Sequence, residues 1–197
     1  MEGKVSLIYG EAGVGKTNVV LWLLSNISAS SKGEVLYIST EGPLYSAALS
    51  RYPFKDNALF SEVYDSNSLL QLILKVYGNV GRELKAVAID TVNNFYRSEV
   101  GYDANAGRVF NAMLAFLCDM SLKYGVTCLL TAQVRGFDDE VKMSGFQVLK
   151  YWCDNVIRLD RLEGSMRGLF IELPDEVNLE VRYTITSKGI ELLSYGH

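Results

Sequence analysis

The stretch Gly10-Glu11-Ala12-Gly13-Val14-Gly15-Lys16-Thr17 decides the fold, because it matches the pattern G-x-x-x-x-G-K-[ST] in suitable surroundings. The apolar run Val5–Tyr9 before it predicts a strand, and Val19–Leu24 after it, apolar nearly all round, predicts a helix deep in the core. Glycines let such a loop wrap around phosphate oxygens, and the helix N-terminus presents free N–H groups and a positive dipole to them. The stretch therefore predicts a P-loop rather than a glycine-rich turn with an exposed lysine.

The last two residues of the predicted loop, Lys16 and Thr17, are expected to bind phosphate and Mg²⁺. Lys16 should reach the β- and γ-phosphate oxygens during catalysis, and Thr17 should offer a hydroxyl ligand to Mg²⁺. The predicted nucleotide contacts within and just after the loop are Gly10, Glu11, Ala12, Gly13, Val14, Gly15, Lys16, Thr17 and Asn18.

Length and composition favour one globular domain over residues 1–197, since the chain is 49% hydrophobic and 21% charged and contains no linker-like tract. Nineteen basic against 23 acidic side chains give a net charge of −4, so overall charge does not favour nucleic acid. The one histidine, His197, argues against a Ser-His-Asp relay or a histidine metal cage. Three scattered cysteines without a C-x-x-C motif predict a reduced, cytoplasmic setting, and no apolar run has the length of a membrane span.

Alternating elements predict an α/β fold. Apolar, β-branched runs recur at Val35–Ile38, Val87–Ile89 and Val126–Leu130, and Ala106–Tyr124 has the three- and four-residue spacing of an amphipathic helix. Strands that are apolar on both faces belong in a parallel sheet covered by helices on each side, so we expect a mostly parallel, doubly wound sheet. The segments expected as antiparallel edge strands are Asn155–Leu162, Arg167–Leu173 and Glu180–Thr186.

Three polar residues that follow predicted strands are candidates for the chemistry of hydrolysis. Asp90 ends an apolar strand in the Walker B manner and would hold Mg²⁺ through a water. Glu41 could orient the attacking water, and Gln133 could sense the γ-phosphate. Taken alone, each also fits a turn, a helix cap or an ordinary loop residue.

The ordered motifs together resemble the RecA-type recombinase ATPase core, most closely the archaeal RadB and RadA paralogue group. Beside the P-loop, the resemblance rests on Thr40-Glu41-Gly42, Ile89-Asp90-Thr91 and Thr131-Ala132-Gln133-Val134, and it extends over nearly the whole chain. It implies a RecA-like P-loop NTPase fold with ATP and Mg²⁺ as cofactors. It also implies that Glu41 is the catalytic glutamate, Asp90 the Walker B carboxylate and Gln133 the γ-phosphate sensor.

Departures from the family pattern predict slow or partner-dependent hydrolysis. Where relatives carry Ser-Pro-Glu-Arg, this chain has Pro43-Leu44-Tyr45-Ser46 and so loses a basic residue; Tyr45 could stack on adenine or simply pack. Ala132 replaces the usual Asn before the sensing Gln, and Leu173-Pro174 replaces basic residues that can act on a neighbour's phosphates. Because the chain begins almost at the P-loop strand, we do not expect filaments by the family's usual route, although a homo-oligomer stays open.

The resemblance places a DNA path along loops 93–105 and 135–147, but the charges in both loops are mixed. Without a cationic excess we expect weak, salt-dependent binding of single-stranded DNA. Aromatic side chains in these loops could stack on bases, pack internally or contact a partner protein: Phe95, Tyr96, Tyr102, Phe137 and Phe146.

The function expected from the resemblance is that of an accessory DNA recombination and repair protein, or mediator, with weak ATPase activity. Its partners would be ATP, single-stranded DNA and the main recombinase or another paralogue. Two alternatives stay open: a KaiC-type signalling or assembly ATPase, which usually has paired glutamates where this chain has Glu41-Gly42, and a nucleotide-gated scaffold that hardly hydrolyses ATP.

Overall fold

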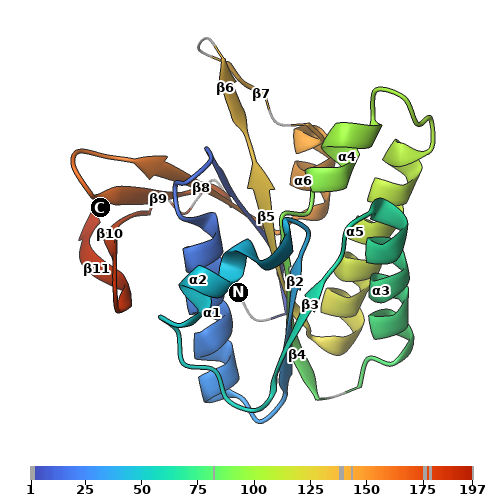
Figure 1. Ribbon diagram of the computed structural model, residues 1–197, viewed down its shortest axis with the longest axis horizontal. Helices are drawn as coiled ribbons and strands as arrows, with labels where there is room; N and C mark the ends of the chain where they lie inside the picture. Colours follow the sequence, from blue (N-terminus) through green and yellow to red (C-terminus); the bar gives the residue numbers. More distant parts are fainter. Residues whose placement is uncertain are drawn as a thin grey trace.

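A computed structural model of the chain describes residues 3–81, 83–137, 140–142, 144–174, 177 and 179–196. For 135–137, 140–142 and 194–196 it describes the backbone only. Within these residues a nine-stranded sheet forms the centre of the molecule. Its strands are β1 (Val5–Gly10), β2 (Glu34–Ser39), β3 (Ala58–Glu62), β4 (Leu84–Asp90), β5 (Thr127–Gln133), β8 (Asn155–Arg161), β9 (Arg167–Leu173), β10 (Glu180–Thr186) and β11 (Gly189–Gly196). Strands β6 (Arg135–Phe137) and β7 (Glu140–Lys142) form a separate hairpin that projects from one end of the sheet (Figure 1).

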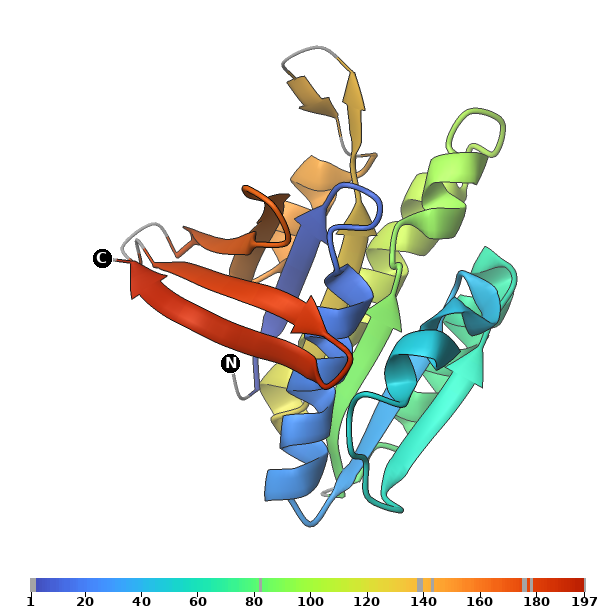
Figure 2. The same cartoon turned by 60° about the vertical axis from the view of Figure 1, so that its left-hand side comes forward.

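The strand order is β11-β10-β9-β8-β1-β5-β4-β2-β3, and the last six strands in this order run parallel. The first three strands in this order, β11, β10 and β9, form an antiparallel extension beside β8 (Figure 2). This arrangement confirms the expected mostly parallel RecA-like sheet. The expected antiparallel pairing of 155–162 is found between β8 and β9, but β8 is not an edge strand. Helix α6 (Phe146–Trp152) turns the chain before β8, which therefore also pairs with β1 in parallel.

Helices cover both faces of the sheet. Helix α1 (Lys16–Ser30) and the short α2 (Ser46–Leu49), which follows a 3₁₀ turn over Gly42–Tyr45, pack on one face. The other face carries α3 (Ser66–Gly78), α5 (Ala106–Tyr124) and α6, with the short α4 (Asn94–Glu99) above α5 (Figure 1).

The strands supply both halves of the core through their alternation. In β1, for example, Leu7 and Tyr9 pack on the α5 side and Ile8 packs on the α1 side, and all three are buried. Burial on both faces explains why the parallel strands read as continuous apolar runs in the sequence. Among the described residues, no helix is both long enough and apolar enough to cross a bilayer.

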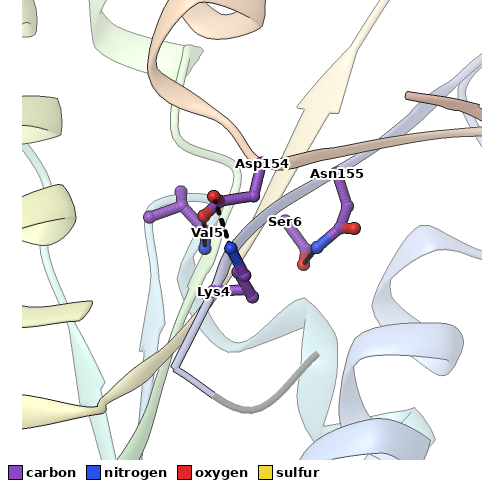
Figure 3. Close-up of polar contacts among 5 residues, drawn as sticks. All are labelled: Lys4, Val5, Ser6, Asp154 and Asn155. Atoms are coloured by element: carbon purple, nitrogen blue, oxygen red, sulfur yellow. Dashed lines mark hydrogen bonds and ion pairs between the residues drawn. The ribbon is translucent and has the colours of Figure 1, made fainter. Parts of the chain in front are cut away.

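Asp154 fixes the start of β1 beside β8 (Figure 3). Its Oδ2 accepts a hydrogen bond from the backbone N–H of Val5 at 2.9 Å, and its Oδ1 accepts one from Lys4 Nζ at 3.1 Å. One step further along the pair, Asn155 Nδ2 donates to Ser6 Oγ at 3.0 Å. Because the lysine pair is exposed to solvent, the bond to the backbone is the stronger restraint on register. This register brings the P-loop to the carboxyl end of the parallel strands.

Candidate nucleotide-binding site

A pocket of about 540 Å³ lies at the carboxyl ends of the parallel strands. Polar groups from the P-loop and from the ends of β2, β4 and β5 meet there with residues of α2, β9 and β10. Its lining consists of Ala12, Gly13, Gly15, Lys16, Thr17, Asn18, Glu41, Leu44, Ala47, Ala48, Arg51, Asp90, Thr91, Gln133, Arg167 and Ile185. The structure therefore brings the predicted Lys16, Thr17, Glu41, Asp90 and Gln133 into one cavity, as expected for ligand sites of open α/β sheets.

The P-loop holds its lysine against its own backbone. Gly13 and Gly15 have φ of 72° and 107°, which gives the loop turns that other residues rarely adopt. Lys16 Nζ donates hydrogen bonds to the carbonyl oxygens of Gly10 at 2.9 Å and Glu11 at 2.8 Å. Burial lowers the pKa of Lys16, partly opposed by the negative charges of the pocket carboxylates. This ammonium group would find a stronger partner in a phosphate.

The Asp90 carboxylate accepts hydrogen bonds from three hydroxyl groups. Thr17 Oγ1 donates to its Oδ2 at 2.7 Å, Tyr37 OH donates to the same oxygen at 2.6 Å, and Thr131 Oγ1 donates to Oδ1. Burial is the largest cause that raises the pKa of Tyr37, followed by the neighbouring Asp90. A hydroxyl and a carboxylate in contact at the foot of a P-loop suit Mg²⁺, a hard cation that takes oxygen ligands. Thr17 would bind the ion directly, and Asp90 would bind it through water.

Glu41 lies beside the Walker B strand. One of its carboxylate oxygens accepts a hydrogen bond from Thr91 Oγ1, the residue after Asp90. The ends of β2 and β4 are tied further by Thr40 Oγ1, which donates to the Thr91 carbonyl at 2.8 Å. The Glu41 side chain therefore faces the pocket from a well-supported position, with one oxygen already engaged.

Gln133 reaches the pocket at the end of β5 and is linked to two further loops through a buried asparagine. Asn93 Oδ1 accepts from the Gln133 backbone N–H at 3.3 Å, and Asn93 Nδ2 lies 3.4 Å from the carbonyl oxygens of both Gln133 and Ser144. Asn93 thus connects the end of β5 to the segments on either side of the predicted DNA path.

Two residues near α2 bear on alternatives that the sequence left open. The Tyr45 ring packs on Phe60, with centroids 5.9 Å apart and planes 3° apart, and on Tyr37 at 4.9 Å. The structure thus shows internal packing for Tyr45, which is not among the residues that line the pocket, and adenine stacking stays a prediction. A basic residue further along the chain, Arg51, does line the pocket, and its Nη1 donates to Asn18 Oδ1 at 3.0 Å.

Four lining or supporting residues were not predicted from the sequence: Tyr37, Arg51, Asn93 and Arg167. They lie within or just beside regular elements and match no motif. Asn93 follows β4 and Arg167 begins β9, whereas Tyr37 lies inside β2 and Arg51 follows α2, so no sequence signal is common to them.

The first predicted DNA loop is packed in its first half and exposed from Val100 to Asn105. Phe95 and Tyr96 are partly buried against the core, and the Tyr96 ring stacks on Phe110 with centroids 4.5 Å apart. Tyr102 is 79% exposed. In the second loop Phe146 packs against Tyr9 at 5.5 Å.

The tip of the second loop falls largely outside the described part of the chain. Its backbone forms the β6–β7 hairpin, but residues 138, 139 and 143 are not described, nor are the side chains of Arg135, Phe137 and Lys142. Stacking by Phe137 and the charge of this tip therefore stay predictions from the sequence.

The mostly parallel sheet, the P-loop at its carboxyl edge and the two carboxylates beside it define a RecA-type core. No family model matches the chain. It is 32% identical over 206 residues to the DNA repair and recombination protein RadB of Archaeoglobus fulgidus, which covers 96% of this chain and 89% of the relative. It is 28% identical over 202 residues to RadB of Methanocaldococcus jannaschii, covering 98% and 94%. A crystal structure of the RadB recombinase matches the fold with a TM-score of 0.75 at 22% identity, over 98% of this chain and 92% of that one.

The chain belongs to the RadB family of RecA-type DNA repair and recombination proteins.

Proposed function

We propose that the protein binds ATP with Mg²⁺, hydrolyses it slowly, and acts as an accessory factor in recombination or repair rather than as the strand-exchange enzyme. The observation that carries this proposal is the hydrogen bond of 2.7 Å between Thr17 and Asp90. It joins the P-loop and the Walker B strand, 73 positions apart, in the arrangement that a nucleotide-bound Mg²⁺ requires. The RadB relatives support the role in repair and recombination.

Slow hydrolysis is supported by the state of Glu41. A residue that orients the attacking water needs a free carboxylate oxygen near the γ-phosphate. In Glu41 one oxygen is held by the hydroxyl of Thr91. Only the other oxygen is then left to orient the attacking water, and the bond to Thr91 restricts the rotation by which the carboxylate could adjust to it.

The same hydrogen bond favours a second candidate function, a nucleotide-gated scaffold that binds ATP and hardly hydrolyses it. In that case ATP would act through the Asn93 connection. A γ-phosphate that engages Gln133 would alter the segments around Ser144 and after Asp90, and so change the affinity for DNA or for the main recombinase.

The test is nucleotide binding and turnover by the wild type, Lys16→Ala and Glu41→Gln. Binding is measured by calorimetry with millimolar Mg²⁺, and turnover is measured with and without single-stranded DNA. We expect Lys16→Ala to show no ATP binding, and Glu41→Gln to bind ATP without hydrolysing it. Equal turnover in all three proteins would remove the catalytic assignment, and an absence of ATP binding by the wild type would overturn the whole proposal.

The two candidate functions give different results in the same experiment. Turnover stimulated by single-stranded DNA supports the accessory ATPase. ATP-dependent capture of the main recombinase without measurable turnover supports the scaffold.

A further inference from the structure

Two arginines that flank the turn of the β8–β9 hairpin lie against the P-loop. Arg161 and Arg167 face each other in the antiparallel register. Arg161 Nη2 donates to the Ala12 carbonyl at 3.3 Å, and Arg167 Nε donates to the Val14 carbonyl at 3.0 Å. The antiparallel extension therefore brings two guanidinium groups to the backbone of the predicted phosphate loop.

Within the described part of the chain, neither of these arginines has a carboxylate at ion-pair distance. Their hydrogen-bond partners are neutral carbonyl oxygens, including that of Ser165, which accepts from Arg167 Nη1 at 2.9 Å. By contrast, Arg158 in the same hairpin is ion-paired with Glu172 at 2.8 Å. Two neighbouring positive charges without a counter-charge, beside a loop that also carries a buried lysine, form a site for an anion.

Arg167 and Arg161 differ in their relation to the nucleotide pocket. Arg167 lines it together with Lys16 and Thr17, whereas Arg161 does not. The approach is close: a Cβ added to Gly15 would lie 3.6 Å from Arg167 Nε. Because Gly15 has no side chain, Arg167 of β9 can approach the loop backbone at this point.

We propose that Arg167 binds the phosphates of a nucleotide held in the P-loop, as a second cation supplied by the same chain. A guanidinium group has five N–H donors, and Arg167 uses two of them on the Val14 and Ser165 carbonyl oxygens. The remaining donors are available for charge-assisted bonds to phosphate oxygens. Arg167 would thereby provide within one chain a charge of the kind that the resemblance places at Leu173-Pro174 in relatives. This inference rests on the proposed function, because it requires that the P-loop binds a nucleotide.

The experiment compares Arg167→Gln, Arg167→Lys and two control variants by calorimetry with ATP and with ADP. Arg161→Gln removes a matched arginine that also bonds to a loop carbonyl but lies outside the pocket. Arg182→Gln removes an exposed arginine of β10 that is paired with Glu180. Thermal unfolding of each variant without nucleotide reports any loss of loop support.

If Arg167 binds phosphate, Arg167→Gln should weaken ATP and ADP binding by about tenfold, since one charge-assisted hydrogen bond is removed. Arg167→Lys should recover most of this loss, Arg161→Gln should have a clearly smaller effect, and Arg182→Gln should behave as the wild type. The affinity of Arg167→Gln for ATP should also depend less on salt concentration than that of the wild type.

Two results would overturn the inference. One is wild-type affinity in Arg167→Gln. The other is an equal loss of affinity in Arg167→Gln and Arg161→Gln with parallel losses of thermal stability, which would show loop support alone. Either result leaves the proposed function intact as long as the wild type binds ATP and Lys16→Ala does not.

Discussion

The hydroxyl of Tyr37 donates a hydrogen bond of 2.6 Å to Oδ2 of Asp90, across the boundary between β2 and β4. The same oxygen accepts the hydroxyl of Thr17 at 2.7 Å, and the other carboxylate oxygen accepts Thr131. Asp90 is buried, so these bonds replace water at both oxygens. Under the proposed function, Tyr37 would therefore be a positioning residue, because it sets the orientation in which the Asp90 carboxylate would meet a metal-bound water.

Replacing Tyr37 with Phe should reveal this positioning. The variant keeps the buried ring and removes one charge-assisted hydrogen bond, so the free energy of unfolding should fall by about 1–2 kcal/mol. The Mg²⁺ concentration that gives half-maximal ATP binding should rise several-fold, whereas ADP binding without Mg²⁺ should change little. Tyr64→Phe is the control, because Tyr64 is 70% exposed and its hydroxyl bonds to Glu62 instead. An unchanged Mg²⁺ dependence in Tyr37→Phe would contradict the assignment.

The buried Lys16 predicts a pH dependence of stability. Burial lowers its pKa in the folded protein, whereas the unfolded chain has the ordinary lysine value of about 10.4. Between these two values the unfolded chain binds more protons than the folded protein, so the free energy of unfolding rises with pH. Lys16→Met removes the effect, and the difference in unfolding free energy, wild type minus variant, should increase from neutral pH toward about pH 10.

Urea denaturation at several pH values, without nucleotide, measures this difference. Saturating ATP should flatten the rise for the wild type, because phosphates favour the charged form of the lysine. If the difference in unfolding free energy between wild type and Lys16→Met falls with rising pH, the charged form of Lys16 does not destabilise the nucleotide-free protein.

Gly15 should not tolerate a side chain. Its φ is 107°, and an added Cβ would lie 2.5 Å from Ile185 Cδ1. Gly15→Ala should lower the free energy of unfolding by about 1–3 kcal/mol and weaken ATP binding, because a residue with a side chain is strained at this φ and the Ile185 side chain must shift. Gly107→Ala, near the start of α5, is the matched control: no described atom lies within 4 Å of the added Cβ, and alanine should stabilise the helix by up to about 1 kcal/mol. Equal effects of the two substitutions would contradict the close packing at the loop.

Local pattern was enough to predict the elements that carry strong periodicity or a motif. Helix α5 has the predicted bounds Ala106–Tyr124, and the strand, loop and helix around Lys16 lie where the motif placed them. These predictions depend on neighbouring residues only. The antiparallel pairing of β8 with β9 was predicted, but its parallel pairing with β1 was not. That pairing depends on the connection through α6, a helix of seven residues whose short apolar pattern gave no clear signal.

For the site, too, only the residues within local motifs could be predicted from the sequence. The motif residues could be placed at strand ends, and parallel strands bring such ends together. Tyr37, in contrast, reads as an ordinary β-forming residue, and Asn93 as an ordinary loop residue. Only the paired strands reveal that the Tyr37 hydroxyl points at Asp90 and that Asn93 joins Gln133 to the second loop. Long-range polar contacts of this kind leave no trace in a single sequence.

The exposure of Tyr102 makes it the best-placed described aromatic residue of its loop for stacking on a base. It is 79% exposed, whereas Tyr96 in the same loop is stacked on Phe110 with planes 9° apart. Tyr102→Ser should therefore weaken the binding of oligo(dT) about fivefold, equivalent to about 1 kcal/mol, without a change in unfolding free energy. Tyr96→Ser should instead lower the unfolding free energy by roughly 2 kcal/mol or more through lost packing.

Fluorescence anisotropy at two salt concentrations, together with urea denaturation, separates these effects. Because phosphate contacts would supply most of the sequence-independent affinity, binding by the wild type and by Tyr102→Ser should weaken by the same factor as salt rises. If Tyr102→Ser binds oligo(dT) as the wild type does, the exposed ring is not a stacking platform. A partner protein then becomes the better explanation of its exposure.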